Sequence, residues 1–363
     1  MSDVSVNQQR ALAALQSMFV GDSLAMPVHW YYRPMDISKE FPGGIAQLEA
    51  APVHHPSSIM SLHSTKRGGR NSSGSAKSQA EIVGDVILKG KRQNWDQVNQ
   101  HYHQGMLAGE NTLNAHCARM LIRVLSANGG HYDANLFLDG YIELMTADEP
   151  MHPDTYAESY HRGFFANFSA GKQRNKCGAI THDTASIGGL VTIGPIVISE
   201  RLRGTSLDQV KSLCHKHLQL THPDASLAKV CSDYVDLLDN LMFREPSQSA
   251  QELIAACAKR SIGVSMADLL ARVHADNEVV GQRYSPACYI SDSWPSILYL
   301  AYKYTDQVKA GLLANTNLGG DNVHRGSVLG TILGLANGHT VSDFYDGLTD
   351  KALIDEELQA LID

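Results

Sequence analysis

The chain has 363 residues, 43% of them hydrophobic, so it can bury a substantial core in one large domain or in two smaller ones. Its formal net charge of -8 argues against nonspecific nucleic-acid binding, which needs Lys and Arg to neutralise phosphates. The N-terminus lacks the pattern of a signal peptide and no apolar run reaches ~20 residues, so we expect a cytoplasmic protein that binds neither nucleic acid nor membranes.

The sequence predicts a single domain covering residues 1–363, because no low-complexity or Pro/Ser-rich linker divides it. The cysteines are scattered without the CxxC or CxH spacing of a zinc module, and no disulfide framework is indicated. We expect reduced and mostly buried thiols at Cys117, Cys177, Cys214, Cys231, Cys257 and Cys288.

The first predicted helix covers roughly residues 6–26 and ends near Pro27. Its small and apolar residues recur at helical spacing, and the pair Gly21-Asp22 lies close to its end. His29 follows the proline stop.

Residues 33–76 are rich in Gly, Pro, Ser and His and show little periodicity. A loop of this length in a compact domain is usually functional or disordered. Within this stretch Lys66, Arg67 and Arg70 alternate with glycines and hydroxyl residues, a composition suited to holding a phosphate. A mobile, solvated loop explains the same composition at least as well.

Helical pattern returns from about residue 76 to 88 and again after Trp95. It leads into a strongly amphipathic stretch whose opening turn carries Glu110 and Asn111, the second predicted contribution to a site. The apolar face of that helix consists of residues 113, 117, 120, 121, 124 and 125.

The helical pattern continues over residues 156–165, where Glu158, His161 and Arg162 are typical of a surface network. A polar loop from Cys177 then runs into an apolar, glycine-containing helix that ends near Pro195.

His182 and Asp183 in that polar loop are candidate acid/base or ligand groups by type. An Asp-Thr pair before a small-residue helix is equally an ordinary helix cap.

Three further helical segments complete the pattern. The turn at Thr221-His222-Pro223-Asp224 precedes a helix to about Leu241, where capping explains the polar residues better than a pocket role for His222. Residues 293–304 form an apolar helix, and residues 340–363 form a helical tail.

The stretch after Ala314 is the most informative in the chain. The pair Gly319-Gly320 allows positive φ or a close approach to a ligand, and Asp321 follows at the start of a small, apolar helix. A helix start of this kind favours anions or holds a metal-binding carboxylate. The alternative is a plain turn in which Asp321 caps the helix.

No strand-like alternation is sustained, so the predicted fold class is all-α. Together, the Gly21-Asp22 and Gly319-Gly320-Asp321 stretches resemble the signature segments of the ADP-ribosylglycohydrolase family, an all-helical group of metal-dependent N- and O-glycosidases that includes the J-type crystallins. The resemblance implies a single large orthogonal helical bundle and a small-molecule or protein-linked ligand of the ADP-ribose type.

Active members of that family have three acidic clusters that meet at a pair of divalent cations, usually Mg²⁺ or Mn²⁺, and this chain departs from all three. His29 replaces a glutamate, and Asn111 and Val323 each replace an aspartate. Hard cations gain most from carboxylate ligands, so we expect the Mg²⁺ or Mn²⁺ pair to be absent or reduced to one weak position at Asp321 and Glu110.

One hypothesis is a remodelled glycosidase. In it, Asp321 or Glu110 activates the water that attacks the anomeric carbon of a ribosyl group, and His29 or His324 handles a proton. Further substrate contacts would come from Asp22, Asn111, Asn322, Arg325, Arg70, His182 and Asp183.

The competing hypothesis is a catalytically inactive, crystallin-like binding or structural protein on the same scaffold, in which Asp321 is a cap and His324 packs between helices. An open polar pocket would favour the enzyme, and a collapsed apolar interior would favour the inactive scaffold.

Overall fold

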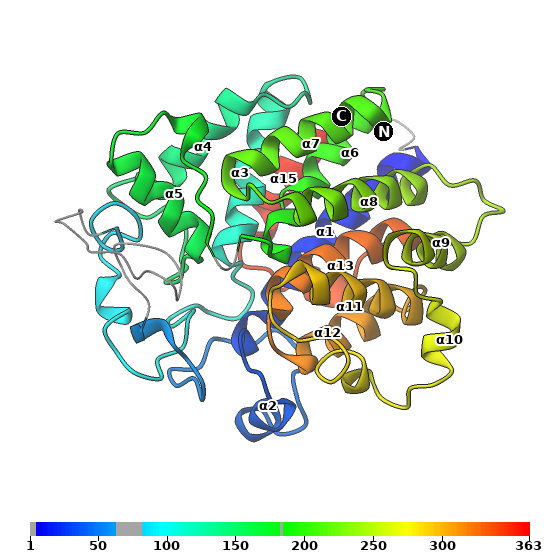
Figure 1. Cartoon of the computed structure of the whole chain (residues 1–363), viewed down its shortest axis with the longest axis horizontal. Helices are drawn as coiled ribbons and strands as arrows, with labels where there is room; N and C mark the ends of the chain where they lie inside the picture. Colours follow the sequence, from blue (N-terminus) through cyan, green and yellow to red (C-terminus); the bar gives the residue numbers. More distant parts are fainter. Residues whose placement is uncertain (1–4, 63–81, 182–183) are drawn as a thin grey trace.

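The computed structural model describes residues 5–62, 82–181 and 184–363. Within these ranges the chain forms fifteen α-helices and only isolated β-bridges, which confirms the all-α prediction (Figure 1). The helices are α1 Val6–Ala25, α2 Pro34–Glu40, α3 Leu113–Ala127, α4 Ala134–Thr146, α5 Ser159–Ser169, α6 Ile193–Leu202, α7 Leu207–Thr221, α8 Ala225–Met242, α9 Ala250–Ile262, α10 Met266–Leu270, α11 Ile290–Lys303, α12 Val308–Leu318, α13 Asn322–Asn337, α14 Ser342–Tyr345 and α15 Lys351–Ile362.

Helices α1 and α13 cross at the centre of the molecule with their backbones in contact (Figure 1). A Cβ atom at Gly330 would lie 2.2 Å from the Ser17 carbonyl oxygen, and one at Gly21 would lie 2.2 Å from the Gly326 carbonyl oxygen. No residue with a Cβ atom fits at such a distance, so glycine at these two positions is what allows the helices to pack this closely. The crossing fixes Asp22 on α1 relative to the first turn of α13.

The first helix confirms the sequence prediction closely. It begins at Val6 and ends at Ala25, where a 3-10 turn, Met26–Val28, contains Pro27. The span Val6–Val28 is long and apolar enough to cross a bilayer, contrary to the expectation from the sequence, but 89% of its most apolar window is buried inside the molecule. It is therefore the core helix of this fold.

Three predicted helical segments are wrong. The described part of the segment 76–88, residues 82–88, forms turns, and the stretch after Trp95 is irregular as well. The segment before Pro195 forms only a short 3-10 turn, Ile187–Leu190, and Pro195 lies in the first turn of α6. The reason is that Ile187 N–H donates to the Cys288 carbonyl rather than along a helix, and proline needs no N–H partner in a first turn.

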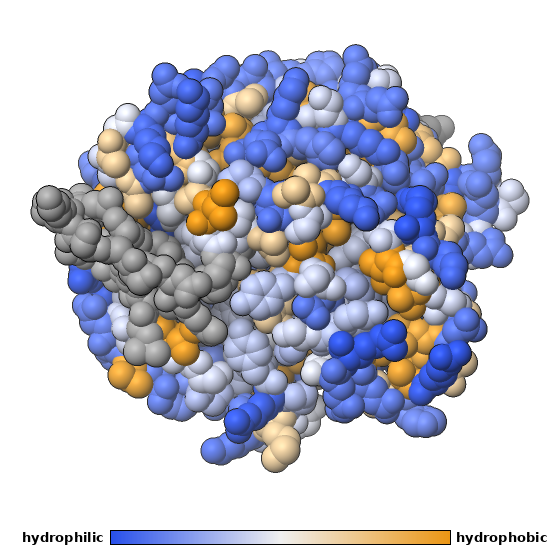
Figure 2. Space-filling view, viewed as in Figure 1, coloured by the Kyte–Doolittle hydropathy of each residue, from blue (hydrophilic) through white to orange (hydrophobic). Residues whose placement is uncertain are grey.

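The surface is mostly hydrophilic on the face shown in Figure 2, and the thiols are buried. On the face shown in Figure 2, hydrophilic residues predominate and apolar residues form small separate groups. All six cysteines are free and buried, as predicted.

Candidate acid and imidazole site

The start of α13 and the turn after α1 bring three predicted residues into contact. The Nε2 atom of His29 lies 3.1 Å from Oδ1 of Asp321, and Nδ1 of His324 lies 2.6 Å from the same oxygen. None of the three residues is more than 3% exposed. We name this group, His29, Asp321 and His324, the central cluster.

The two glycines before Asp321 create the approach. Gly319 and Gly320 have φ of 66° and 68°, and Gly320 N–H donates to the Tyr31 carbonyl at 2.7 Å while Trp30 N–H donates to the Gly320 carbonyl at 2.8 Å. A Cβ atom at Gly319 would lie 2.1 Å from the Tyr31 oxygen. Both glycines therefore have the positive φ that the sequence allowed, and their close approach is to the backbone of the segment that carries His29.

Asp321 occupies the N-cap position of α13 but does not act as a cap. Its side chain accepts no hydrogen bond from the first turn of the helix, and Oδ2 has no hydrogen-bond partner among the residues that the structure describes. A buried polar atom without a partner costs about 1–3 kcal/mol, so a carboxylate kept in this state indicates a role other than capping.

A second imidazole connects His29 to a second carboxylate. His103 Nε2 lies 2.7 Å from His29 Nδ1, and His103 Nδ1 lies 2.7 Å from Asp154 Oδ1. Asp154 also accepts from the Leu113 N–H at 2.8 Å and the Tyr156 N–H at 3.0 Å. Burial alone would raise the pKa of Asp154, but His103 and these N–H donors hold it well below its usual range.

A third carboxylate lies on the other side of the central cluster. Glu158 Oε2 is 3.6 Å from His324 Nε2 and accepts from Asn114 Nδ2 at 2.7 Å. Glu158, His161 and Arg162 are buried, so the interpretation of this segment as a surface network is wrong. His161 Nε2 lies 3.0 Å from Asn114 Oδ1, which joins α5 to the start of α3.

Asp22 joins α1 to the start of α3. Its carboxylate accepts from Asn111 Nδ2 at 2.8 Å, from the Thr112 N–H at 2.8 Å and from the Thr112 hydroxyl at 2.6 Å. Asn111 also donates to the Phe19 carbonyl at 2.9 Å, so both of its amide hydrogens are used within the protein.

The remaining predicted site residues lie elsewhere. Glu110 is partly exposed and accepts from the Leu107 N–H at 2.7 Å within its own loop, so the structure does not bring it to the central cluster. Arg325 is buried, and its guanidinium donates to Asn315 Oδ1 at 2.7 Å and the Gly319 carbonyl at 2.8 Å, which gives no support to phosphate binding. Asn322 donates to the Thr316 carbonyl at 2.9 Å.

The predicted positions Arg70, His182 and Asp183, together with Lys66 and Arg67, lie outside the described residues.

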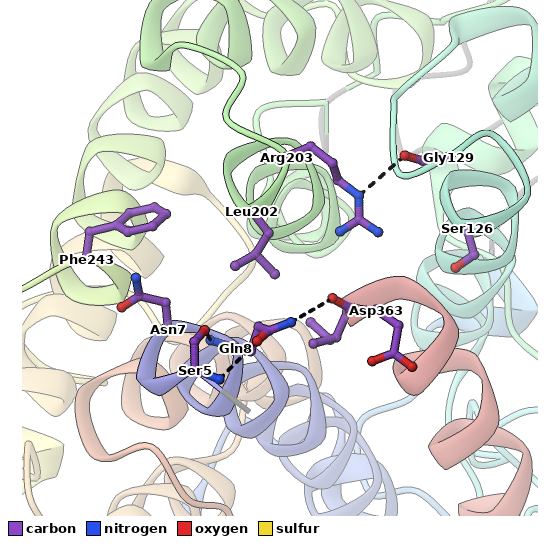
Figure 3. Close-up of a pocket in the computed structure, with 10 residues that line it drawn as sticks. Ser5, Asn7, Gln8, Ser126, Gly129, Leu202, Arg203, Phe243 and Asp363 are labelled. Carbon is purple, nitrogen blue, oxygen red and sulfur yellow. Dashed lines mark hydrogen bonds between the residues drawn. The ribbon is translucent and has the colours of Figure 1, made fainter. Parts of the chain in front are cut away.

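A hollow of about 570 Å³ opens far from this cluster, where the start of α1 meets the ends of α6 and α15 (Figure 3). Its lining includes Gln8, Arg203 and Asp363, and Arg203 donates to the Gly129 carbonyl. The rise of an α-helix places Gln8 about 21 Å from Asp22 along α1, so the hollow is separate from the cluster.

Over residues 4–363 the sequence matches the family described as ADP-ribosylglycohydrolase. The chain belongs to the ADP-ribosylglycohydrolase family. Its fold is similar to that of a solved structure titled "ADP-ribosylglycohydrolase-related protein complex", with a TM-score of 0.56 and 18% identity over 98% of each chain. No curated protein sequence matches the chain.

The residues present do not fit the pair of Mg²⁺ or Mn²⁺ ions that the ADP-ribosylglycohydrolase family implies. Val323 packs in an apolar group with Ala25, Met26 and Met106, and the amide of Asn111 is committed to Asp22. What converges instead is one carboxylate and two imidazoles, which offer ligand atoms within 4.8 Å of one another. Imidazole is a poor ligand for Mg²⁺.

The charges of the central cluster are unequal. Burial lowers the pKa of His29 to about 3, so this ring is neutral near pH 7. Burial would lower the pKa of His324 as well, but Asp321 and Glu158 raise it to about 10. The charged His324 ring holds the pKa of Asp321 well below its usual range against the effect of burial. The charge of the protonated His324 ring therefore offsets that of Asp321.

Proposed function

We propose that this ADP-ribosylglycohydrolase-family chain hydrolyses a ribosyl N- or O-glycosidic bond in an ADP-ribose-type compound, at the central cluster and Glu158. The single observation that carries the proposal is the convergence of two buried carboxylates, Asp321 and Glu158, on either side of His324. Family membership supports the reaction class. We retain a cytoplasmic location as part of the proposal.

Hydrolysis joins a water oxygen to the anomeric carbon, breaks the glycosidic bond, and moves one proton from the water and one to the leaving group. Asp321 stays ionised, so it is a poor base but a good partner for the positive charge that develops on the ribose ring. Glu158 takes the proton from the water, because its carboxylate lies at the edge of the central cluster, with Oε2 3.6 Å from His324 Nε2.

The test is release of ADP-ribose from N-linked and O-linked ADP-ribosyl peptides, followed by chromatography. We expect Asp321→Asn and Glu158→Gln to lower kcat at least about 100-fold, which is the usual contribution of an electrostatic stabiliser and of a positioned base. Glu110→Gln, in the exposed loop, is the matched control and should keep wild-type turnover. Full activity in Asp321→Asn would remove the central cluster from the reaction.

One observation favours a second function, that of a non-catalytic binding or structural protein. The central cluster is polar, which argues against the collapsed apolar interior, but it is also at most 3% exposed. Wild-type protein that binds ADP-ribose in calorimetry, yet releases none from either peptide class, would establish this alternative.

A further inference from the structure

The central cluster contains one oxygen atom and one nitrogen atom that lack a hydrogen-bond partner among the described residues. Oδ2 of Asp321 and Nδ1 of His324 are both buried, and neither has a hydrogen-bond partner within the described part of the chain. His324 Nδ1 is only 2.6 Å from Asp321 Oδ1, but the contact lacks hydrogen-bond geometry. Native proteins rarely bury such atoms unless a ligand, water or ion completes them.

The hydrogen bonds behind His29 decide which of its ring nitrogens carries a proton. Asp154 is an ionised acceptor, so His103 donates to it through Nδ1. In the tautomer in which His103 accepts at Nε2, His29 donates to it through Nδ1. The Nε2 atom of His29 is left with a lone pair that faces Asp321 Oδ1 at 3.1 Å.

A lone pair that faces a carboxylate oxygen at 3.1 Å is unfavourable unless a cation lies between them. A metal ion satisfies the lone pair of His29, the orphan nitrogen of His324 and the orphan oxygen of Asp321 together.

We propose that His29, Asp321 and His324 form a mononuclear site for a divalent transition-metal ion of the zinc class, with His103 and Asp154 as positioning residues. Two imidazole nitrogens and one carboxylate oxygen are the donors that zinc prefers, and a carboxylate that orients a metal-binding histidine through its second nitrogen is the usual supporting arrangement. Val323 provides no ligand atom for a second ion.

The site also fits zinc on electrostatic grounds. Asp321 and Glu158 lie on opposite sides of His324, and Asp154 lies one imidazole beyond His29, so three buried carboxylates surround the cluster. A divalent ion that takes the place of the His324 proton offsets this negative charge without the oxygen-rich ligand set that Mg²⁺ needs. This inference is independent of the proposed hydrolysis, because metal content is measured without substrate.

The test uses the full-length chain with any purification tag removed. After chelation and dialysis, we expect mass spectrometry to find one Zn²⁺ per chain on reloading, and Co²⁺ to give visible absorption bands. Zn²⁺ should raise the melting temperature at concentrations where Mg²⁺ has no effect. Equal stabilisation by Mg²⁺ and Zn²⁺, or no uptake of Zn²⁺, would overturn the proposal.

Variants assign the ligands. His324→Ala and Asp321→Asn should weaken Zn²⁺ binding at least about 100-fold, while His103→Ala should weaken it about 10–100-fold because it acts through His29. His217→Gln replaces an equally buried histidine outside the cluster and should bind Zn²⁺ as the wild type does. Circular dichroism identifies unfolded variants, and Asp321→Asn keeps the test valid because it preserves side-chain shape. Wild-type affinity in folded Asp321→Asn and His324→Ala would refute the site.

Discussion

Two buried histidines of this protein contact partners of different kinds, one carboxylates and the other hydroxyl groups. His324 lies between the carboxylates of Asp321 and Glu158, which raise its pKa to about 10 against the effect of burial. His217 on α7 lies between the hydroxyls of Tyr132 and Thr192, and burial lowers its pKa to about 3. The degree of burial is nearly the same, so the partner decides the charge of the ring.

The two sites also differ in how completely they are satisfied. His217 has a partner at each ring nitrogen, at 3.0 Å and 2.8 Å, and packs edge-on against Phe137. In the central cluster, Oδ2 of Asp321 and Nδ1 of His324 have no hydrogen-bond partner in the part of the chain that the structure describes. A satisfied buried histidine is a packing element, whereas an unsatisfied one beside carboxylates is a candidate for chemistry.

The largest effect on stability should come from removing a carboxylate partner. Asp154→Ala leaves His103 and the Leu113 and Tyr156 N–H groups without their acceptor. We expect a loss of about 3–5 kcal/mol in the free energy of unfolding, because three buried donors lose their acceptor and each unsatisfied buried group costs about 1–3 kcal/mol. Urea unfolding of the metal-free protein measures it, and a loss below 1 kcal/mol would show that the His103 and Asp154 pair is not held as described.

An intermediate effect should appear when the pH falls. The folded pKa of His217 is about 3, below the 6.5 of an unfolded chain, so its contribution to stability is complete above pH 6.5 and is lost as the pH falls toward 3. Each histidine of this kind removes about 1.4 kcal/mol per pH unit. Between pH 6.5 and 5, the free energy of unfolding of His217→Gln should therefore fall by about 2 kcal/mol less than that of the wild type, as measured by urea unfolding. Parallel curves for both proteins would contradict a neutral His217.

The smallest effect on stability should come from removing a hydroxyl partner of His217. Thr192→Val removes the partner of His217 Nε2 but leaves Tyr132 in place. Because Thr192 is half-buried, we expect a loss of about 1 kcal/mol, typical of one neutral hydrogen bond. Thermal unfolding measures it, with Thr205→Val, whose hydroxyl contacts Glu200 instead, as a comparison. A loss as large as that of Asp154→Ala would remove the distinction between charged and neutral partners.

The parts of the site that lie next to sequence signals could be predicted. The glycine pair before Asp321 and the Gly-Asp pair before Pro27 indicated helix ends, and the structure brings His29 and His324 to Asp321. Periodicity also located α1, α3 and α8 well, because these helices bury one continuous apolar face or are buried all round.

The supporting residues could not be predicted, because nothing in their local pattern distinguishes them. Glu158 and His161 look like solvent-facing residues until Asn114, more than forty positions earlier, supplies their partner. His103 and Asp154 lie in irregular segments whose conformation is set by contacts across the chain. The one available signal was the unusual density of histidine around residues 101–103.

The crossing of α1 and α13 has a consequence for biosynthesis. Helix α1 ends at Ala25 and α13 begins at Asn322, so the ribosome completes the second helix on the order of 15–60 s after the first, at typical bacterial and eukaryotic elongation rates. During that interval the apolar helix α1 lacks the helix against which it packs in the folded protein. We expect nascent or truncated chains that lack α13 to aggregate unless a chaperone shields α1. The central cluster can form only after α13, which carries His324, has been synthesised.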